Sequence, residues 1–126
     1  MNNAKNPIVL LVEDDLFLQR MYAAKLAKEG LNALTAVDGE KALALMSETV
    51  PAVVLLYILM PKKDGFAVLE AMRADERLKD VPVVLLTNLG EQEDVKRARR
   101  LGANEYLIKA HFLPSEVIGV VKKYIK

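Results

Sequence analysis

The sequence contains no cysteine and a single histidine, His111. Without cysteine the chain can form neither a disulfide nor a thiolate metal site. A lone histidine with no other histidine or cysteine is a poor basis for a metal site, so we interpret His111 as a surface residue. A reducing compartment is consistent with this composition.

Long hydrophobic runs and an excess of one charge are missing as well. No apolar stretch approaches the roughly 20 residues of a membrane span, and segment 1–6 lacks the apolar core of a signal peptide. Lys and Arg total 18 against 17 Asp and Glu, a net charge of +1, so no global field marks a nucleic-acid binder. We therefore expect a cytoplasmic protein that binds neither membranes nor nucleic acids.

Length and hydrophobic content indicate one compact unit. The 126 residues are 52% hydrophobic, which suffices for a sizeable core at this length. No linker, internal repeat or low-complexity stretch divides the chain. We expect a single domain over residues 1–126.

Short apolar runs alternate with longer amphipathic segments. Three runs of Val, Ile and Leu predict central parallel strands, at 8–12, 52–56 and 81–86. Two mixed runs, 31–37 and 105–108, predict strands nearer the sheet edges. Helices are predicted between and after them: 18–26 with Gly30 as its stop, one capped by Asp38, one capped by Asp64, 91–101 stopped by Gly102, and 114–124.

Five alternations of strand and helix predict a doubly wound α/β sandwich of three layers. The expected sheet is parallel, with the flavodoxin-like strand order 2-1-3-4-5 of a (βα)5 domain. Ligands of such sheets bind beyond the carboxyl ends of the strands. The polar residues at those ends are the candidates for function: Glu13, Asp14, Asp15, Tyr57, Thr87 and Lys109.

The run from Val53 to Gly65, VVLLYILMPKKDG, resembles the third strand and following loop of response-regulator receiver domains. In that family an acidic pair holds Mg²⁺, an aspartate accepts a phosphoryl group, and a hydroxyl residue and a lysine contact it. Four residues match this set over essentially the full chain: Glu13, Asp14, Thr87 and Lys109. The resemblance implies that Tyr57 stands where the family carries the acceptor aspartate.

Further roles follow from the same resemblance. Mg²⁺ would be held by Glu13, Asp14 and the carbonyl of Leu59, only weakly or not at all, because one carboxylate and the phosphate are missing. Tyr106 matches an aromatic switch residue whose rotamer follows Thr87. Asn88 is larger than the usual residue after the hydroxyl and narrows the pocket. Partners, a histidine kinase or a downstream effector, would contact the fourth helix, fifth strand and fifth helix, and a homodimer stays open.

Tyrosine cannot replace an acceptor carboxylate. Its phenol has an ordinary pKa of about 10, and neighbouring carboxylates disfavour the anion further. We expect Tyr57 to fill or cross the pocket, donating to Asp14 or Glu13 and contacting Lys109. We also expect Lys109 to pair with Asp14.

A second departure from the family follows Lys109. Family members often have proline there, with a cis bond, whereas this chain has Ala110. A cis bond before a residue other than proline costs about 2.5–4 kcal/mol. We therefore predict a trans bond.

Plainer interpretations exist for most of these residues. The three acids after the first strand could cap the first helix, Thr87 and Lys109 could be ordinary polar residues, and Tyr106 could serve packing. The basic run at 96–100 follows Glu93 and Asp94, an order that the helix dipole and near-neighbour ion pairs favour. We interpret that run as a solvated helix face.

Three functions remain in competition. The first is a pseudo-receiver, a signalling interaction module independent of phosphorylation. The second is a receiver phosphorylated at a substitute carboxylate such as Asp14, and the third is an ordinary regulator with an engineered Asp-to-Tyr change at position 57. A flavin enzyme is disfavoured because the acidic loop 13–15 would repel its phosphate, so we do not expect an enzyme.

Overall fold

The computed structural model describes residues 6–58, 64–88 and 92–125. Its strands form one parallel sheet in the order β2-β1-β3-β4-β5, which confirms the predicted topology. The strands are β1 (Ile8–Val12), β2 (Asn32–Ala36), β3 (Val53–Tyr57), β4 (Val83–Thr87) and β5 (Glu105–Ile108). The helices are α1 (Leu16–Lys28), α2 (Gly39–Met46), α3 (Gly65–Arg73), α4 (Gln92–Arg100), the short 3-10 helix η2 (Lys109–His111) and α5 (Pro114–Lys123).

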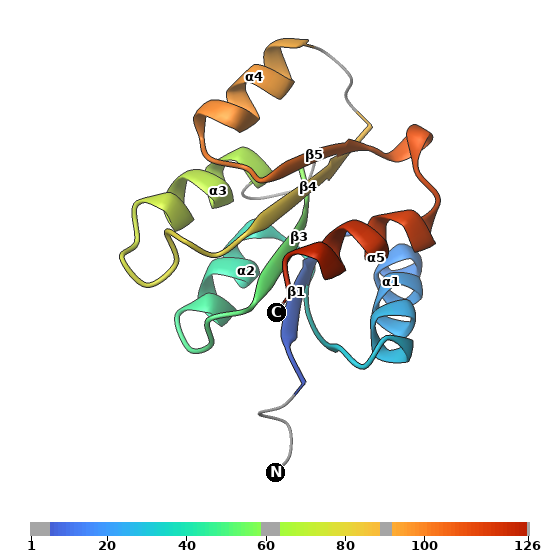
Figure 1. Cartoon of the computed structure of the whole chain (residues 1–126). Helices are drawn as coiled ribbons and strands as arrows, with labels where there is room; N and C mark the ends of the chain where they lie inside the picture. The colour runs from blue at the N-terminus through green and yellow to red at the C-terminus, as the bar shows by residue number, and fades with distance from the viewer. Residues whose placement is uncertain (1–5, 59–63, 89–91, 126) are drawn as a thin grey trace.

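Helices cover both faces of the sheet (Figure 1). Because side chains alternate along a strand, neighbouring residues of β1 enter different cores. Leu10 packs with α2, α3 and α4, whereas Leu11 packs with α1 and α5. Two hydrophobic cores separated by the sheet make the three predicted layers.

The predicted helix ends are largely confirmed. Asp38 and Asp64 accept backbone hydrogen bonds from Lys41 and Ala67 as N-caps. Gly30 and Gly102 have φ of +79° and +92° beyond the ends of α1 and α4.

Three strands differ from prediction by one or two residues at their ends. The third strand runs 53–57 rather than 52–56, and β4 begins at Val83 rather than at residue 81. Pro82 precedes β4 and has no N–H to donate to a ladder. The second strand is 32–36 rather than 31–37. As a result, Tyr57 is the last residue of β3 and Thr87 is the last residue of β4.

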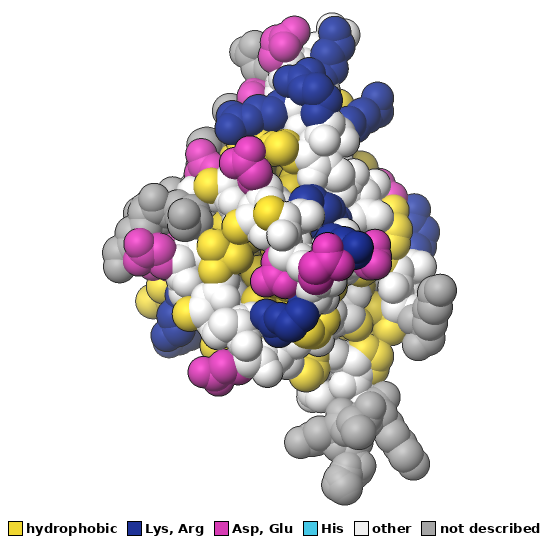
Figure 2. Space-filling model, turned by 90° about the vertical axis from the view of Figure 1, so that its left-hand side faces the viewer, with side chains coloured by type: hydrophobic (Ala, Val, Ile, Leu, Met, Phe, Trp, Pro, Cys, Tyr) yellow, Lys and Arg dark blue, Asp and Glu magenta, His cyan; other side chains and the backbone are white. Residues whose placement is uncertain are grey.

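Helix α4 is the most polar part of the fold. Only Ala98 is buried among its nine residues. Dark-blue side chains gather at the top of Figure 2, where α4 lies in Figure 1. Arg97 stacks over the ring of Phe66 at 4.3 Å, and within the described ranges Lys96, Arg99 and Arg100 form no ion pair. Among the described residues, Glu93 and Asp94 therefore form no ion pair with the cations of this helix.

Arg73, at the end of α3, joins two connections of the chain. Its guanidinium donates to the carbonyl oxygens of Leu78, Lys79 and Val81, before β4. It also donates to the carbonyl of Gly102, before β5, at 2.8 Å and 3.2 Å. A planar guanidinium has enough donors to serve both loops at once.

We predict that Arg73→Leu lowers the free energy of unfolding by about 2 kcal/mol, because several carbonyls lose a charged donor. Urea unfolding measures the change. Arg20, which is exposed, provides the control: Arg20→Leu should stay within about 0.5 kcal/mol of the parent. Equal stability of the two variants would contradict the role given to Arg73.

Candidate functional site

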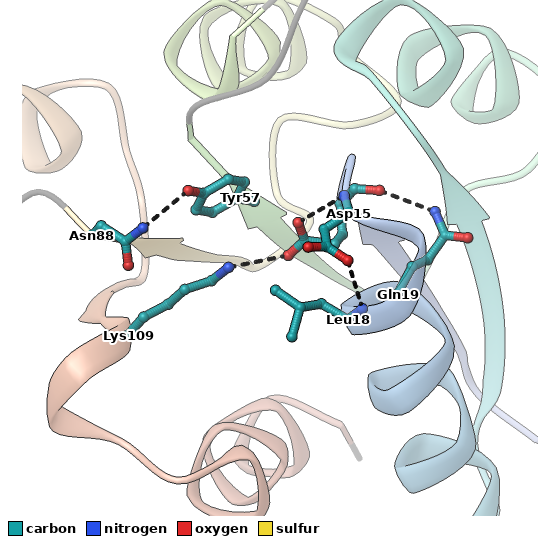
Figure 3. Close-up of polar contacts among 7 residues, drawn as sticks. Asp15, Leu18, Gln19, Tyr57, Asn88 and Lys109 are labelled. Carbon is teal, nitrogen blue, oxygen red and sulfur yellow. Dashed lines mark hydrogen bonds and ion pairs between the residues drawn. The ribbon is translucent and has the colours of Figure 1, made fainter.

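The carboxyl ends of four strands bring the candidate residues together. Glu13 follows β1, Tyr57 ends β3, Thr87 ends β4 and Lys109 follows β5. The strand register aligns Tyr57 with Leu86 in β4. The side chains of Tyr57, Lys109 and Asn88 point toward one another above this edge (Figure 3).

Glu13 is a buried carboxylate, with 1% of its surface exposed. Its Oε2 accepts the backbone N–H of Asp15 at 3.2 Å, and its Oε1 accepts from Nζ of Lys109 at 3.4 Å. Desolvation by burial raises the pKa of Glu13, while the Asp15 N–H and the Lys109 ammonium partly offset that rise. The two contacts keep a costly buried charge satisfied.

The other two acids of this loop have different places. Asp14 is exposed. Asp15 accepts the N–H of Leu18 at 3.1 Å as the N-cap of α1. The capping interpretation is therefore correct for Asp15. Of the three acids, Glu13 is the one that is buried.

Lys109 lies between a carboxylate and an aromatic ring. Its ammonium is 3.4 Å from Glu13 and 3.9 Å from the centroid of the Tyr57 ring. Its side chain is 18% exposed, so both attractions act with little screening. The expected pair with Asp14 is not the one formed, because Glu13 is the carboxylate that points inward.

Tyr57 is half-buried, and its hydroxyl accepts a hydrogen bond from Nδ2 of Asn88 at 3.3 Å. The expected donation to Glu13 or Asp14 is replaced by this contact, since the ring extends from β3 toward the end of β4 (Figure 3). Burial raises the pKa of Tyr57, and the negative charges of Glu13 and Asp14 raise it further. The phenol is therefore neutral at neutral pH.

A hydrogen bond joins the side chains of Thr87 and Tyr106. Thr87 is fully buried, and Tyr106 is partly exposed. The pKa of Tyr106 is raised by burial and by Asp94, and a hydrogen bond with Thr87 lowers it. The contact joins the end of β4 to the surface beside α4.

Gly65 sets the geometry of the chain around β3. A Cβ at this position would lie 2.8 Å from Cα of Ile58 and 3.1 Å from the carbonyl oxygen of Tyr57. Only glycine lets α3 begin this close to the strand end. The carbonyl of Leu59, one of the expected Mg²⁺ ligands, lies outside the described residues.

The connection after β5 is a short 3-10 helix, η2, over Lys109–His111. No peptide bond in the described ranges is cis, in agreement with the prediction for Ala110. His111 is exposed on this turn.

Two features near the site were not anticipated from the sequence. Gln19 is buried and donates to the carbonyls of Glu13 and Ala36, at 3.0 Å and 3.3 Å. Leu16 and Phe17 are 53% and 77% exposed. Helical spacing could have identified Phe17 as exposed, because it lies outside the apolar face that α1 buries. The burial of Gln19 could not have been identified in this way, because glutamine is usually exposed.

The described residues do not fit a magnesium site. Mg²⁺ needs a near-octahedral set of oxygen ligands. Glu13 already accepts from Lys109 and Asp15, which leaves exposed Asp14 as the uncommitted acid of the expected pair. Within the described part of the chain, no three His, Cys, Asp or Glu residues gather as metal ligands would.

Comparison with protein families identifies the class. The model of the response regulator receiver domain matches residues 9–121. The chain therefore belongs to the response-regulator receiver domain family of two-component signalling. None of the described helices has the length and apolar character to cross a membrane.

Similar curated proteins include transcriptional regulators. The chain is 37% identical over 120 residues to the DNA-binding dual master transcriptional regulator RpaA of Synechocystis, and 36% identical over 118 residues to the probable transcriptional regulator ycf27 of Guillardia theta. The matches cover 95% and 94% of this chain but 49% and 45% of those proteins. The chain thus spans about half the length of these relatives.

Similar solved structures include a Vibrio cholerae chemotaxis protein, CheY4, with a TM-score of 0.88 and 27% identity over 95% of this chain and 99% of that one. The phosphorylated cyanobacterial phytochrome response regulator RcpA has a TM-score of 0.81 and 29% identity, covering 94% of this chain and 90% of its own.

We predict that Lys109→Met destabilises the fold by about 2 kcal/mol near pH 7, because Glu13 loses its cation while buried. The folded-state pKa of Glu13 is already raised above 4.5 and would rise further. Glu13 then binds its proton more tightly in the folded state than in the unfolded state. The loss of stability caused by Lys109→Met therefore becomes smaller as the pH falls from about 7 toward 5.

Urea unfolding at both pH values measures this effect, with Glu13→Gln as the background control. In that background Lys109→Met should cost less, and its cost should not change with pH. A deficit that is the same at both pH values, or the same with Gln at position 13, would show that the ion pair is not its source.

Proposed function

We propose that this chain is a single receiver domain, residues 1–126, that accepts no phosphoryl group at position 57. It acts as an interaction module whose partner binding is independent of phosphorylation. The observation that carries the proposal is the position of Lys109, whose ammonium lies 3.9 Å from the Tyr57 ring and 3.4 Å from Glu13. The lysine and the ring occupy the space that a phosphoryl group would need.

The chemistry of position 57 supports this proposal. Phosphoryl transfer to a receiver needs an ionised carboxylate in line with phosphorus. Tyr57 offers a phenol instead, and its raised pKa keeps the oxygen protonated. The hydroxyl is also engaged by Asn88. No step of phosphoryl transfer is therefore assigned to this side chain.

The same arrangement favours one fixed state of the switch. In an ordinary receiver the lysine and the hydroxyl residue respond to an incoming phosphoryl group. Here Lys109 is paired with Glu13 in the absence of any phosphoryl group, and Thr87 is hydrogen-bonded to Tyr106. We infer that the site does not alternate between two conformations in response to a phosphodonor.

We propose that a histidine kinase or an effector protein contacts the face formed by α4, β5 and α5. The exposed cations of α4 suit an acidic protein surface, and Tyr106 connects that face to Thr87. DNA binding is named for the Synechocystis regulator, of which this chain spans only 49%. We assign no nucleic-acid binding to this domain, because no aromatic platform or groove-reading helix accompanies its basic residues in the part of the chain that the structure describes.

Incubation with Mg²⁺ and a small phosphodonor, followed by intact mass measurement, tests the proposal. The chain itself should gain no phosphoryl group, because it lacks the nucleophile. Tyr57→Asp restores a carboxylate, and Tyr57→Asn is the matched control of equal size without a nucleophile.

Each outcome has a definite meaning. A phosphoryl group on Tyr57→Asp alone would show that position 57 by itself disables a competent pocket, as in a regulator altered at that residue. A group on neither protein would mean that the pocket has diverged more widely. A group on the unaltered chain that Asp14→Asn removes would overturn the proposal and make Asp14 the acceptor.

Magnesium binding should follow the same substitution. We predict that Tyr57→Asp binds Mg²⁺ at least about tenfold more tightly than the unaltered chain, because a third carboxylate joins Glu13 and Asp14. Titration followed by amide NMR shifts around residues 13–15 measures both affinities, and Tyr57→Asn is again the control. Equal affinities would contradict the account of the site.

A further inference from the structure

A groove lies between α1 and α5 on the opposite side of the sheet from α4. It has a volume of about 280 Å³. The last turn of α1 contributes Lys25 and Lys28, and one face of α5 contributes Ser115, Ile118 and Lys122. This volume is close to the lower limit, about 300 Å³, of pockets that hold small molecules.

The charge in this groove is predominantly positive. Its single acid, Glu29, is paired with Nζ of Lys122 at 2.5 Å, and that contact lowers the pKa of Glu29. Lys25 and Lys28 form no ion pair within the described ranges. Their two ammonium groups are therefore available to an anion.

Gly119 gives an independent reason to consider this groove. Glycine in the middle of a helix lowers stability relative to alanine. Here a Cβ would meet no atom within 4 Å, and φ is not positive. Neither close packing nor backbone geometry requires glycine, but its missing side chain keeps the groove open.

We propose that the groove binds a small phosphate-bearing molecule. The ammonium groups of Lys25 and Lys28 would contact the phosphate oxygens, and Ser115 would donate a hydrogen bond. Ile118 would lie beneath the apolar part of the ligand. Lys25 and Lys28 lie in the last turn of α1, at the end remote from Asp15, so the proposal is independent of the pocket at Tyr57.

Amide NMR titration with adenosine monophosphate tests the proposal, with adenosine as the ligand that lacks phosphate. We expect shifts in the last turn of α1 and along α5 with the phosphate compound only. The double variant with Lys25→Gln and Lys28→Gln should bind adenosine monophosphate about tenfold or more weakly. Lys41→Gln with Lys96→Gln removes the same charge elsewhere and should leave the affinity nearly unchanged.

Gly119→Leu separates an open groove from a general charge effect. Leucine is a strong helix former, so α5 should remain folded while the side chain fills the space. Binding should be lost with an unchanged circular dichroism spectrum. The proposal is overturned by shifts scattered over other lysines, by equal shifts with adenosine, or by a glutamate-rich peptide that binds where the nucleotide does not. That last result would assign the groove to an acidic protein segment.

Discussion

The buried carboxylate of Glu13 is the constraint on which the site depends. A charge with 1% exposure must be satisfied within the fold, and the N–H of Asp15 and the ammonium of Lys109 do so. Lys109 is thereby held across the carboxyl edge of the sheet. Once the lysine is there, its ammonium lies 3.9 Å from the centroid of the Tyr57 ring, and the two groups stabilise each other.

An aromatic residue at the end of β3 changes what this pocket can do. A carboxylate there would compete with Glu13 for Lys109 and would join Glu13 and Asp14 in binding a divalent cation, whereas a neutral phenol does neither. The ring attracts the ammonium through its face and places its hydroxyl beside Asn88. A site that could respond to phosphate is, in our proposal, converted into a fixed structural element. The surface of the domain is left to carry its function.

The fold could be predicted because the order of apolar and polar residues along the chain indicates which segments are buried. The uninterrupted apolar runs of β1, β3 and β4 are typical of strands covered on both faces, and their alternation with helices leaves few topologies. Asp38, Asp64 and Gly102 identified helix ends through local hydrogen bonds and backbone geometry. Strand ends follow less directly from the apolar pattern: β4 begins at Val83 because Pro82 has no N–H to donate.

The sequence by itself determined which residues reach the site, because the carboxyl ends of parallel strands must share one edge of the sheet. Tertiary structure alone decided their partners. Glu13 and Lys109 are 96 positions apart, and only the packed sheet shows that Glu13 points inward while Asp14 faces solvent. The same holds for the contact of Asn88 with Tyr57 and for the groove beside Gly119. Local patterns specify strands and caps, but the contact made by a side chain depends on direction and distance between elements, which no local pattern contains.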